Sequence, residues 1–100
     1  FAEAAWQTAR VGPYPREAEQ FQQDELKQLT CLCWHMQIAS RNAPFFLSCR
    51  KVQTLMGLST HQIAARRLRG LVKCGVLEIV EQGGPKTNKA TRYRYVSLFP

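Results

Sequence analysis

The stretch that decides the fold is residues 48–81, which read SCRKVQTLMGLSTHQIAARRLRGLVKCGVLEIVE. Its first part predicts a short helix that begins after Ser48, because a serine hydroxyl at the N-cap accepts a hydrogen bond from a backbone N–H of the first turn. Gly57 is expected to end this helix, since glycine readily adopts the left-handed conformation that follows many helices. The side chains predicted to face the core are Val52, Leu55 and Met56.

A second helix is expected after a tight turn. Ser59 and Gln62 match a capping box, in which the serine hydroxyl accepts from a backbone N–H and the glutamine side chain reaches back. Gly75 is placed to end the helix as the residue just after it. One face of the helix is apolar at helical spacing and is expected to pack in the core: Ala64, Leu68, Leu71 and Val72.

After Gly75 the apolar pattern changes from helical to alternating. Residues Val76–Glu81 and Thr91–Leu98 therefore predict two strands. Residues 82–90 between them are polar, basic and rich in turn-forming residues, so we expect an antiparallel hairpin with a basic loop. Upstream, Phe45-Phe46-Leu47 predicts a brief strand.

The first forty residues are expected to be mainly helical. Residues 1–9 predict a short helix, which the two prolines and the glycine of residues 11–15 interrupt. We interpret residues 1–15 as a segment outside the domain, either a linker or the tail of a preceding part that folds back. The start without Met fits a domain of a longer protein. Residues 16–40 contain no Gly or Pro and predict one long amphipathic helix, or two short ones, with an apolar stripe of Phe21, Leu26, Leu29, Leu32, Cys33 and Met36.

This order of helix, short strand, helix, turn, helix and hairpin resembles a winged helix-turn-helix domain. The likeness covers residues 48–95 and is carried by Gly57-Leu58-Ser59, by the spacing of Leu68, Leu71 and Gly75, and by the hairpin that follows. It implies that residues 16–100 form a mainly helical α+β domain, with a three-helix core and a small antiparallel β-hairpin as its wing. It also implies binding to double-stranded DNA.

A narrower likeness lies in residues 44–50 and 68–72, which look like winged-helix domains appended to plasmid or phage primases and replication-initiation proteins. The resemblance implies a role in DNA replication or in transcription regulation. One departure concerns the spacing from Gly57 to Gly75, which is a residue longer than the family pattern. This extra residue leaves the register of the third helix open.

Charge is distributed unevenly along the chain. Residues 1–40 carry three Lys/Arg and five Asp/Glu, which gives 3 − 5 = −2, whereas residues 41–100 carry eleven and two, which gives 11 − 2 = +9. An excess confined to one part of a chain favours a polyanionic partner for that part. The alternative is a basic domain without a ligand.

Helical geometry places several of these cations on one face. If the apolar stripe faces the core, polar and basic side chains lie opposite it, and the start of the helix is the part that a recognition helix uses to contact bases. Gln can pair with adenine and Arg with guanine, whereas cations of the hairpin suit phosphates. The predicted DNA-binding set is Thr60, His61, Gln62, Arg66, Arg69, Lys73, Lys86, Lys89, Arg92 and Arg94. The alternative for this helix is a solvated basic face on a core helix.

A second hypothesis is a protein-docking module within a replication assembly. The interface would then be the long helix with Trp34, or the segment around Trp6. Dimerisation through the long helix is compatible with either hypothesis.

Other function classes have little support. Cys31, Cys33 and His35 suggest a metal site, but neighbours two apart on a helix point about 200° from each other, so we expect no metal. With one Asp and two separated His, and without a phosphate-binding or nucleophile motif, we expect no catalytic residues, no enzyme activity and no cofactor. No apolar run is long enough for a membrane span. The four cysteines are expected to be reduced, in the cytoplasm.

Overall fold

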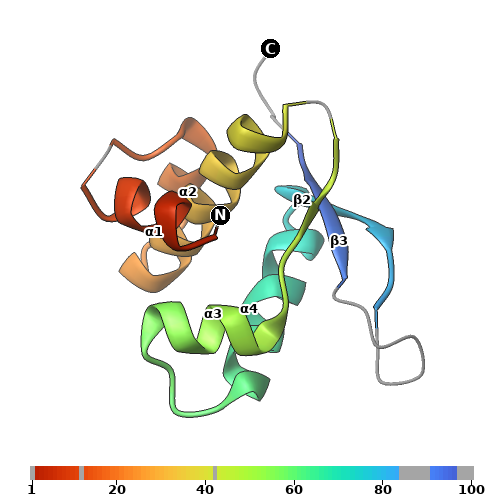
Figure 1. Ribbon diagram of the computed structural model, residues 1–100. Helices are drawn as coiled ribbons and strands as arrows, with labels where there is room; N and C mark the ends of the chain where they lie inside the picture. Colours follow the sequence, from red (N-terminus) through yellow and green to blue (C-terminus); the bar gives the residue numbers. More distant parts are fainter. Residues whose placement is uncertain (1, 12, 42, 84–90, 97–100) are drawn as a thin grey trace.

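Helices and a small sheet make an α+β fold (Figure 1). The structure, a computed structural model, describes residues 2–11, 13–41, 43–83 and 91–96. Within these residues the elements in chain order are α1 (Ala2–Val11), the 3-10 helix η1 (Arg16–Gln20), α2 (Asp24–Ser40), β1 (Phe45–Phe46), α3 (Cys49–Met56), α4 (His61–Lys73), β2 (Leu77–Glu81) and β3 (Arg92–Tyr95).

α2 lies at the centre of the hydrophobic core. Its residues 29–33 are completely buried, so every side of the helix is covered over this length. The buried hydroxyl of Thr30 donates to the Leu26 carbonyl oxygen at 2.8 Å, which satisfies it inside the core. Residues 16–40 were predicted to form one long amphipathic helix or two short ones, and the chain forms two helices, the short η1 and the longer α2. The predicted stripe was incomplete, because Thr30 and Cys31, outside it, are as buried as Leu29.

α1 and η1 both pack against α2 and contribute to the burial of its residues 29–33. Ala5, Trp6 and Ala9 of α1 belong to the same buried cluster as α2, and the small alanines let the two helices approach closely. η1 brings the buried carboxylate of Glu17 to the sheet, where it accepts a hydrogen bond from the Tyr95 hydroxyl. Segments at opposite ends of the chain therefore pack on one core.

α3 and α4 are joined by a turn whose ends are set by capping residues. The Ser48 hydroxyl accepts from the Lys51 amide at 3.0 Å, and Gly57 has φ +66°, so both predicted ends of α3 are confirmed. α4 begins one residue later than predicted, because the Thr60 hydroxyl, and not Ser59, accepts from the Ile63 amide at 3.3 Å. Serine and threonine both cap helices, and the carbonyl of Ser59 is held in the turn by the side-chain amide of Gln53.

The three strands form an antiparallel sheet in the order β1-β3-β2. Phe45 and Ile79 are both register partners of Tyr93, and Phe45 and Tyr93 are buried with ring centroids 6.2 Å apart. Gly75, with φ +81°, follows α4 as predicted and turns the chain into β2. The strands are shorter than the sequence predicted, and residues 97 and 98 of the second predicted strand lie outside the described residues.

Candidate nucleic-acid interface

α4 presents a continuous polar face to solvent. Ala64, Leu68 and Leu71 are buried, as the sequence predicted. At 100° per residue, the side chains on the opposite side lie within a narrow arc, and all are exposed: Gln62, Arg66, Arg69 and Lys73. Among the described residues, none of the three cations forms an ion pair. The geometry thus brings together four of the predicted DNA-binding residues.

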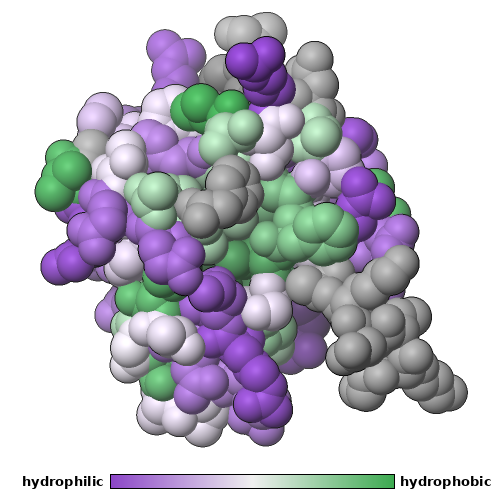
Figure 2. All heavy atoms as spheres, in the orientation of Figure 1, coloured by the Kyte–Doolittle hydropathy of each residue, from purple (hydrophilic) through white to green (hydrophobic). Residues whose placement is uncertain are grey.

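The pair of helices α3 and α4 contains no acidic residue. Residues 49–73 hold six Lys/Arg and neither Asp nor Glu. Two of these cations, Arg50 and Lys51, lie in the first turn of α3, where the helix dipole disfavours positive charge. Hydrophilic side chains gather over α3 and α4 in the lower part of the face shown in Figure 2. A polyanion would relieve this concentration of like charge.

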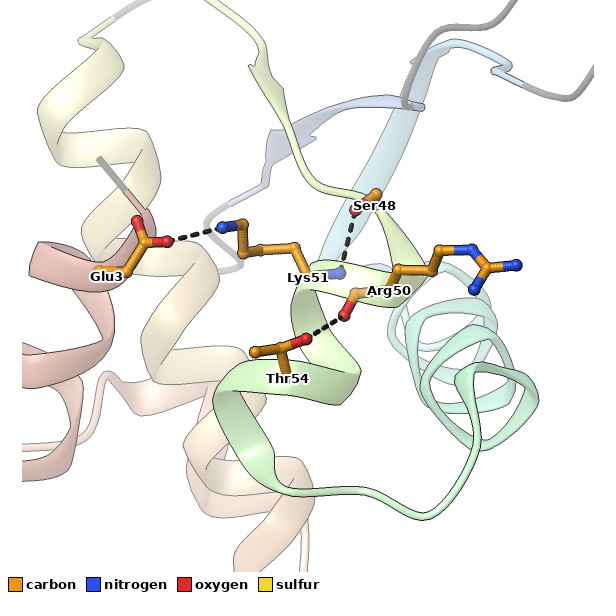
Figure 3. Close-up of polar contacts among 5 residues, drawn as sticks. All are labelled: Glu3, Ser48, Arg50, Lys51 and Thr54. Atoms are coloured by element: carbon orange, nitrogen blue, oxygen red, sulfur yellow. Dashed lines mark hydrogen bonds and ion pairs between the residues drawn. The ribbon is translucent and has the colours of Figure 1, made fainter.

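Arg50 and Lys51 are used differently, although they are adjacent. The Lys51 ammonium contacts the Glu3 carboxylate of α1 at 2.6 Å, and this ion pair lowers the pKa of Glu3 to about 2. The side chain of Arg50 is exposed and extends away from Glu3 and Lys51 (Figure 3). Lys51 therefore helps to hold α1, whereas Arg50 is presented to solvent.

At the start of α4 the predicted contact residues separate. The Thr60 hydroxyl is occupied as the N-cap, and His61 is half-buried. Gln62 is exposed on the same side as Arg66. Of the three residues predicted to contact bases at the helix start, Gln62 is the best presented.

The arginines of β3 lie opposite acidic residues of β2. Arg94 is the register partner of Glu78, and Arg92 is the partner of Glu81 across a bulge. Arg92 Nη1 lies 3.7 Å from Glu81 Oε2, and its guanidinium carbon lies 5.1 Å from the Phe46 ring centroid. Arg94 is exposed, as expected, but Arg92 is half-buried and packed on the sheet. This face of the sheet is electrically balanced by its own glutamates.

The predicted loop residues Lys86 and Lys89 lie outside the described residues. On the strand that follows this loop, Tyr93 is buried, and Tyr95 is half-buried with its amide donating to Gln37 Oε1 at 2.9 Å. The position of Gln37 was not predicted. Its side-chain amide also donates to the carbonyls of Arg41 and Ala43, which ties the end of α2 to the sheet.

A groove runs beside the basic face, between α4 and the first turn of α2. It has a volume of about 460 Å³, and its lining is Gln23, Leu26, Ile63, Arg66, Arg67 and Gly70. Arg67 was not among the predicted contact residues, because its side chain points about 100° away from that of Arg66. The isolated glycine within α4 was the available signal, since glycine inside a helix costs about 1 kcal/mol relative to alanine.

Metal chemistry gains no support from the two buried cysteines of α2. Burial raises the pKa of the Cys33 thiol far above its usual range and raises that of Cys31, so both thiols stay protonated and do not favour a cation. All four cysteines are free thiols. Over the described ranges, no group of three His, Cys, Asp or Glu side chains is placed to hold a metal ion.

No helix in the described part of the chain has the length and apolar character required to cross a membrane. No protein-family model matches the chain, and neither a curated protein nor a solved structure matches it.

Proposed function

We propose that this chain is a winged helix-turn-helix domain that binds double-stranded DNA, with α4 as its recognition helix. The observation that carries the proposal is the outer face of α4, where Arg66, Arg69 and Lys73 are exposed without an acidic neighbour on α3 or α4. A helix with such a face fits the major groove, and the arginines have the geometry to read guanine.

The first turn of α3 adds a second point of contact in this proposal. Arg50 and the first backbone N–H groups of α3 favour an anion, because the helix dipole is positive at this end. A phosphate bound there would fix the position of the DNA without reading its sequence. Base recognition is then assigned to Gln62 and Arg66, nearest the start of α4.

The sheet is assigned a smaller part. Arg94 is exposed and suits a contact with the DNA backbone, whereas Arg92 already contacts Glu81 and Phe46.

We assign the whole domain to a larger replication or regulatory protein of the cytoplasm, in keeping with its resemblance to the winged helices of primases and initiators. The docking hypothesis stays a prediction for Trp34, whereas Trp6 is buried in the core of this chain.

The proposal is tested by fluorescence anisotropy with duplex, single-stranded and forked DNA over a salt series. Wild type should bind duplex with a steep salt dependence. The double variant Arg69→Ala/Lys73→Ala should lower the salt slope by about 2, because two phosphate contacts are lost. Its control is Arg10→Ala/Arg41→Ala, which removes the same charge from exposed positions outside α3 and α4.

Equal losses in the two double variants would contradict the proposal, since affinity would then depend on net charge and not on the face of α4. Binding of wild type that does not change with salt would contradict it as well. A preference for single-stranded DNA would retain a nucleic-acid function but reject α4 as a helix that reads the major groove.

A further inference from the structure

The groove between α4 and the start of α2 combines apolar and cationic groups. Leu26 and Ile63 supply apolar surface, and Arg66 and Arg67 supply two guanidiniums. No ion pair joins either arginine to an acidic residue within the described ranges. Such a surface complements a ligand that carries apolar and acidic groups side by side.

Arg67 has an unsatisfied hydrogen-bonding group at this groove. Its Nη1 atom is buried and has no hydrogen-bond partner among the described residues. A buried charged N–H without a partner is costly, and a guanidinium is well matched to the two oxygens of a carboxylate. Rotation of Arg67 toward a carboxylate in the groove would remove this cost.

Gly70 indicates what must approach the helix. Glycine is a poor residue for the interior of a helix, so its place in α4 calls for a reason. That reason does not lie in the packing of the described residues, because a Cβ at Gly70 would meet no atom of theirs within 4 Å beyond the adjacent residues and backbone of α4 itself. A bare stretch of helix backbone beside an apolar groove allows the close approach of another backbone.

We propose that this groove binds an amphipathic helix of a partner protein, whose apolar stripe is flanked by Asp or Glu. Two helices with an apolar groove between them form a common receptor for such a segment. The apolar stripe would cover Leu26 and Ile63, the backbone would pass over Gly70, and a carboxylate would pair with Arg67. The groove adjoins the basic face of α4 and shares Arg66 with it, so a bound partner helix would compete with or adjust DNA binding.

The probe for the test is a short synthetic peptide of leucine and glutamate, with leucine at alternating third and fourth positions, labelled for fluorescence anisotropy. Wild type should bind this peptide, and the same peptide with glutamine in place of glutamate should bind at least about tenfold more weakly. Arg67→Gln should weaken binding of the acidic peptide by about tenfold. The control Arg41→Gln removes the same charge at the far end of α2, about 22 Å from Leu26 along the helix, and should leave affinity unchanged.

The result expected for Gly70→Ala cannot be explained by a folding defect. Because a Cβ meets open space and alanine favours the helix, this variant should melt about 4–8 °C higher than wild type. It should also bind the acidic peptide several-fold more weakly, since the methyl group prevents the close approach of the partner backbone. Higher stability together with weaker binding identifies the surface of Gly70 as a contact site.

Three outcomes would overturn the proposal. The first is equal binding of the acidic and glutamine peptides, or no binding of either. The second is a wild-type chain that dimerises in analytical ultracentrifugation while Gly70→Ala stays monomeric, because the occupant is then a second copy. The third is absence of peptide binding together with a loss of duplex affinity in Arg67→Gln, which would assign the groove to DNA.

Discussion

The outer face of α4 and the outer face of the sheet both carry arginines, but their surroundings differ. On α4 the cations are exposed and without acidic neighbours, whereas on β3 each arginine lies opposite a glutamate of β2. Both sets were predicted to contact DNA, the first as part of a recognition helix and the second as cations of the hairpin. The comparison teaches that the pairing of each cation, more than the number of cations, indicates where a polyanion would bind.

The largest effect is expected for Arg66→Ala. Loss of a guanidinium that reads a base should cost about 1–3 kcal/mol of binding free energy for the preferred duplex and should reduce the difference between preferred and random sequences. The measurement is a competition anisotropy assay with a selected and a scrambled duplex. If the variant loses affinity for both duplexes equally, Arg66 contacts phosphate and the assignment to base reading is wrong.

Arg92→Ala should affect stability more than DNA binding. The variant loses the contact with Phe46 and the ion pair with Glu81. Its free energy of unfolding, measured by urea denaturation, should therefore fall by about 0.5–1 kcal/mol. Duplex affinity should change by less than about twofold, because this cation is already compensated. The matched variant is Arg94→Ala, which should unfold like wild type. A large loss of DNA affinity in Arg92→Ala would reverse the contrast between the two faces.

Glu81→Gln sharpens the same contrast by adding charge to the sheet. Removal of this carboxylate frees Arg92 and should raise duplex affinity at low salt by about two- to fivefold, which corresponds to the value of an exposed ion pair. Glu19→Gln makes the same change of net charge on η1, at an exposed position, and serves as the control. An equal gain in both variants would show that the sheet has no place in the interface.

The smallest effect, on thermal stability, is expected for Glu3→Gln. This substitution removes the carboxylate that pairs with Lys51 of α3. The pKa of Glu3 is lowered from 4.5 to about 2, so its stabilising contribution is fully present above pH 4.5 and is lost as the pH falls toward 2. The difference in Tm between wild type and Glu3→Gln should therefore be small at neutral pH and should vanish in strong acid. A Tm difference that grows as the pH falls would contradict this prediction.

Local signals predicted the second half of the chain better than the first. Ser48, Gly57 and Gly75 act on the backbone within a few residues, so their roles could be inferred without knowledge of the tertiary structure. The start of α4 was displaced by one residue because Ser59 and Thr60 are equally suited to cap a helix. Local sequence preferences do not distinguish between two adjacent residues that cap a helix equally well.

The burial of α2 could not be inferred from its own pattern. Thr30 and Cys31 are completely buried, but no periodic signal marks them, because burial on all sides removes the contrast that defines an amphipathic helix. The pairing of Arg92 with Glu81 was missed for a related reason. It depends on a bulge that shifts the register between β2 and β3, and alternation alone does not reveal a shift of one residue.

The order of the strands has a consequence for biosynthesis. The central strand of the sheet, β3, is the last of the three to leave the ribosome, so β1 and β2 have no partner within the sheet until residues 92–95 emerge. Until then both strands expose unpaired backbone groups, and Phe46 and Val80 lie on them as apolar side chains. The nascent chain is thus most prone to aggregation just before β3 leaves the ribosome, and slower translation at that stage would prolong that state.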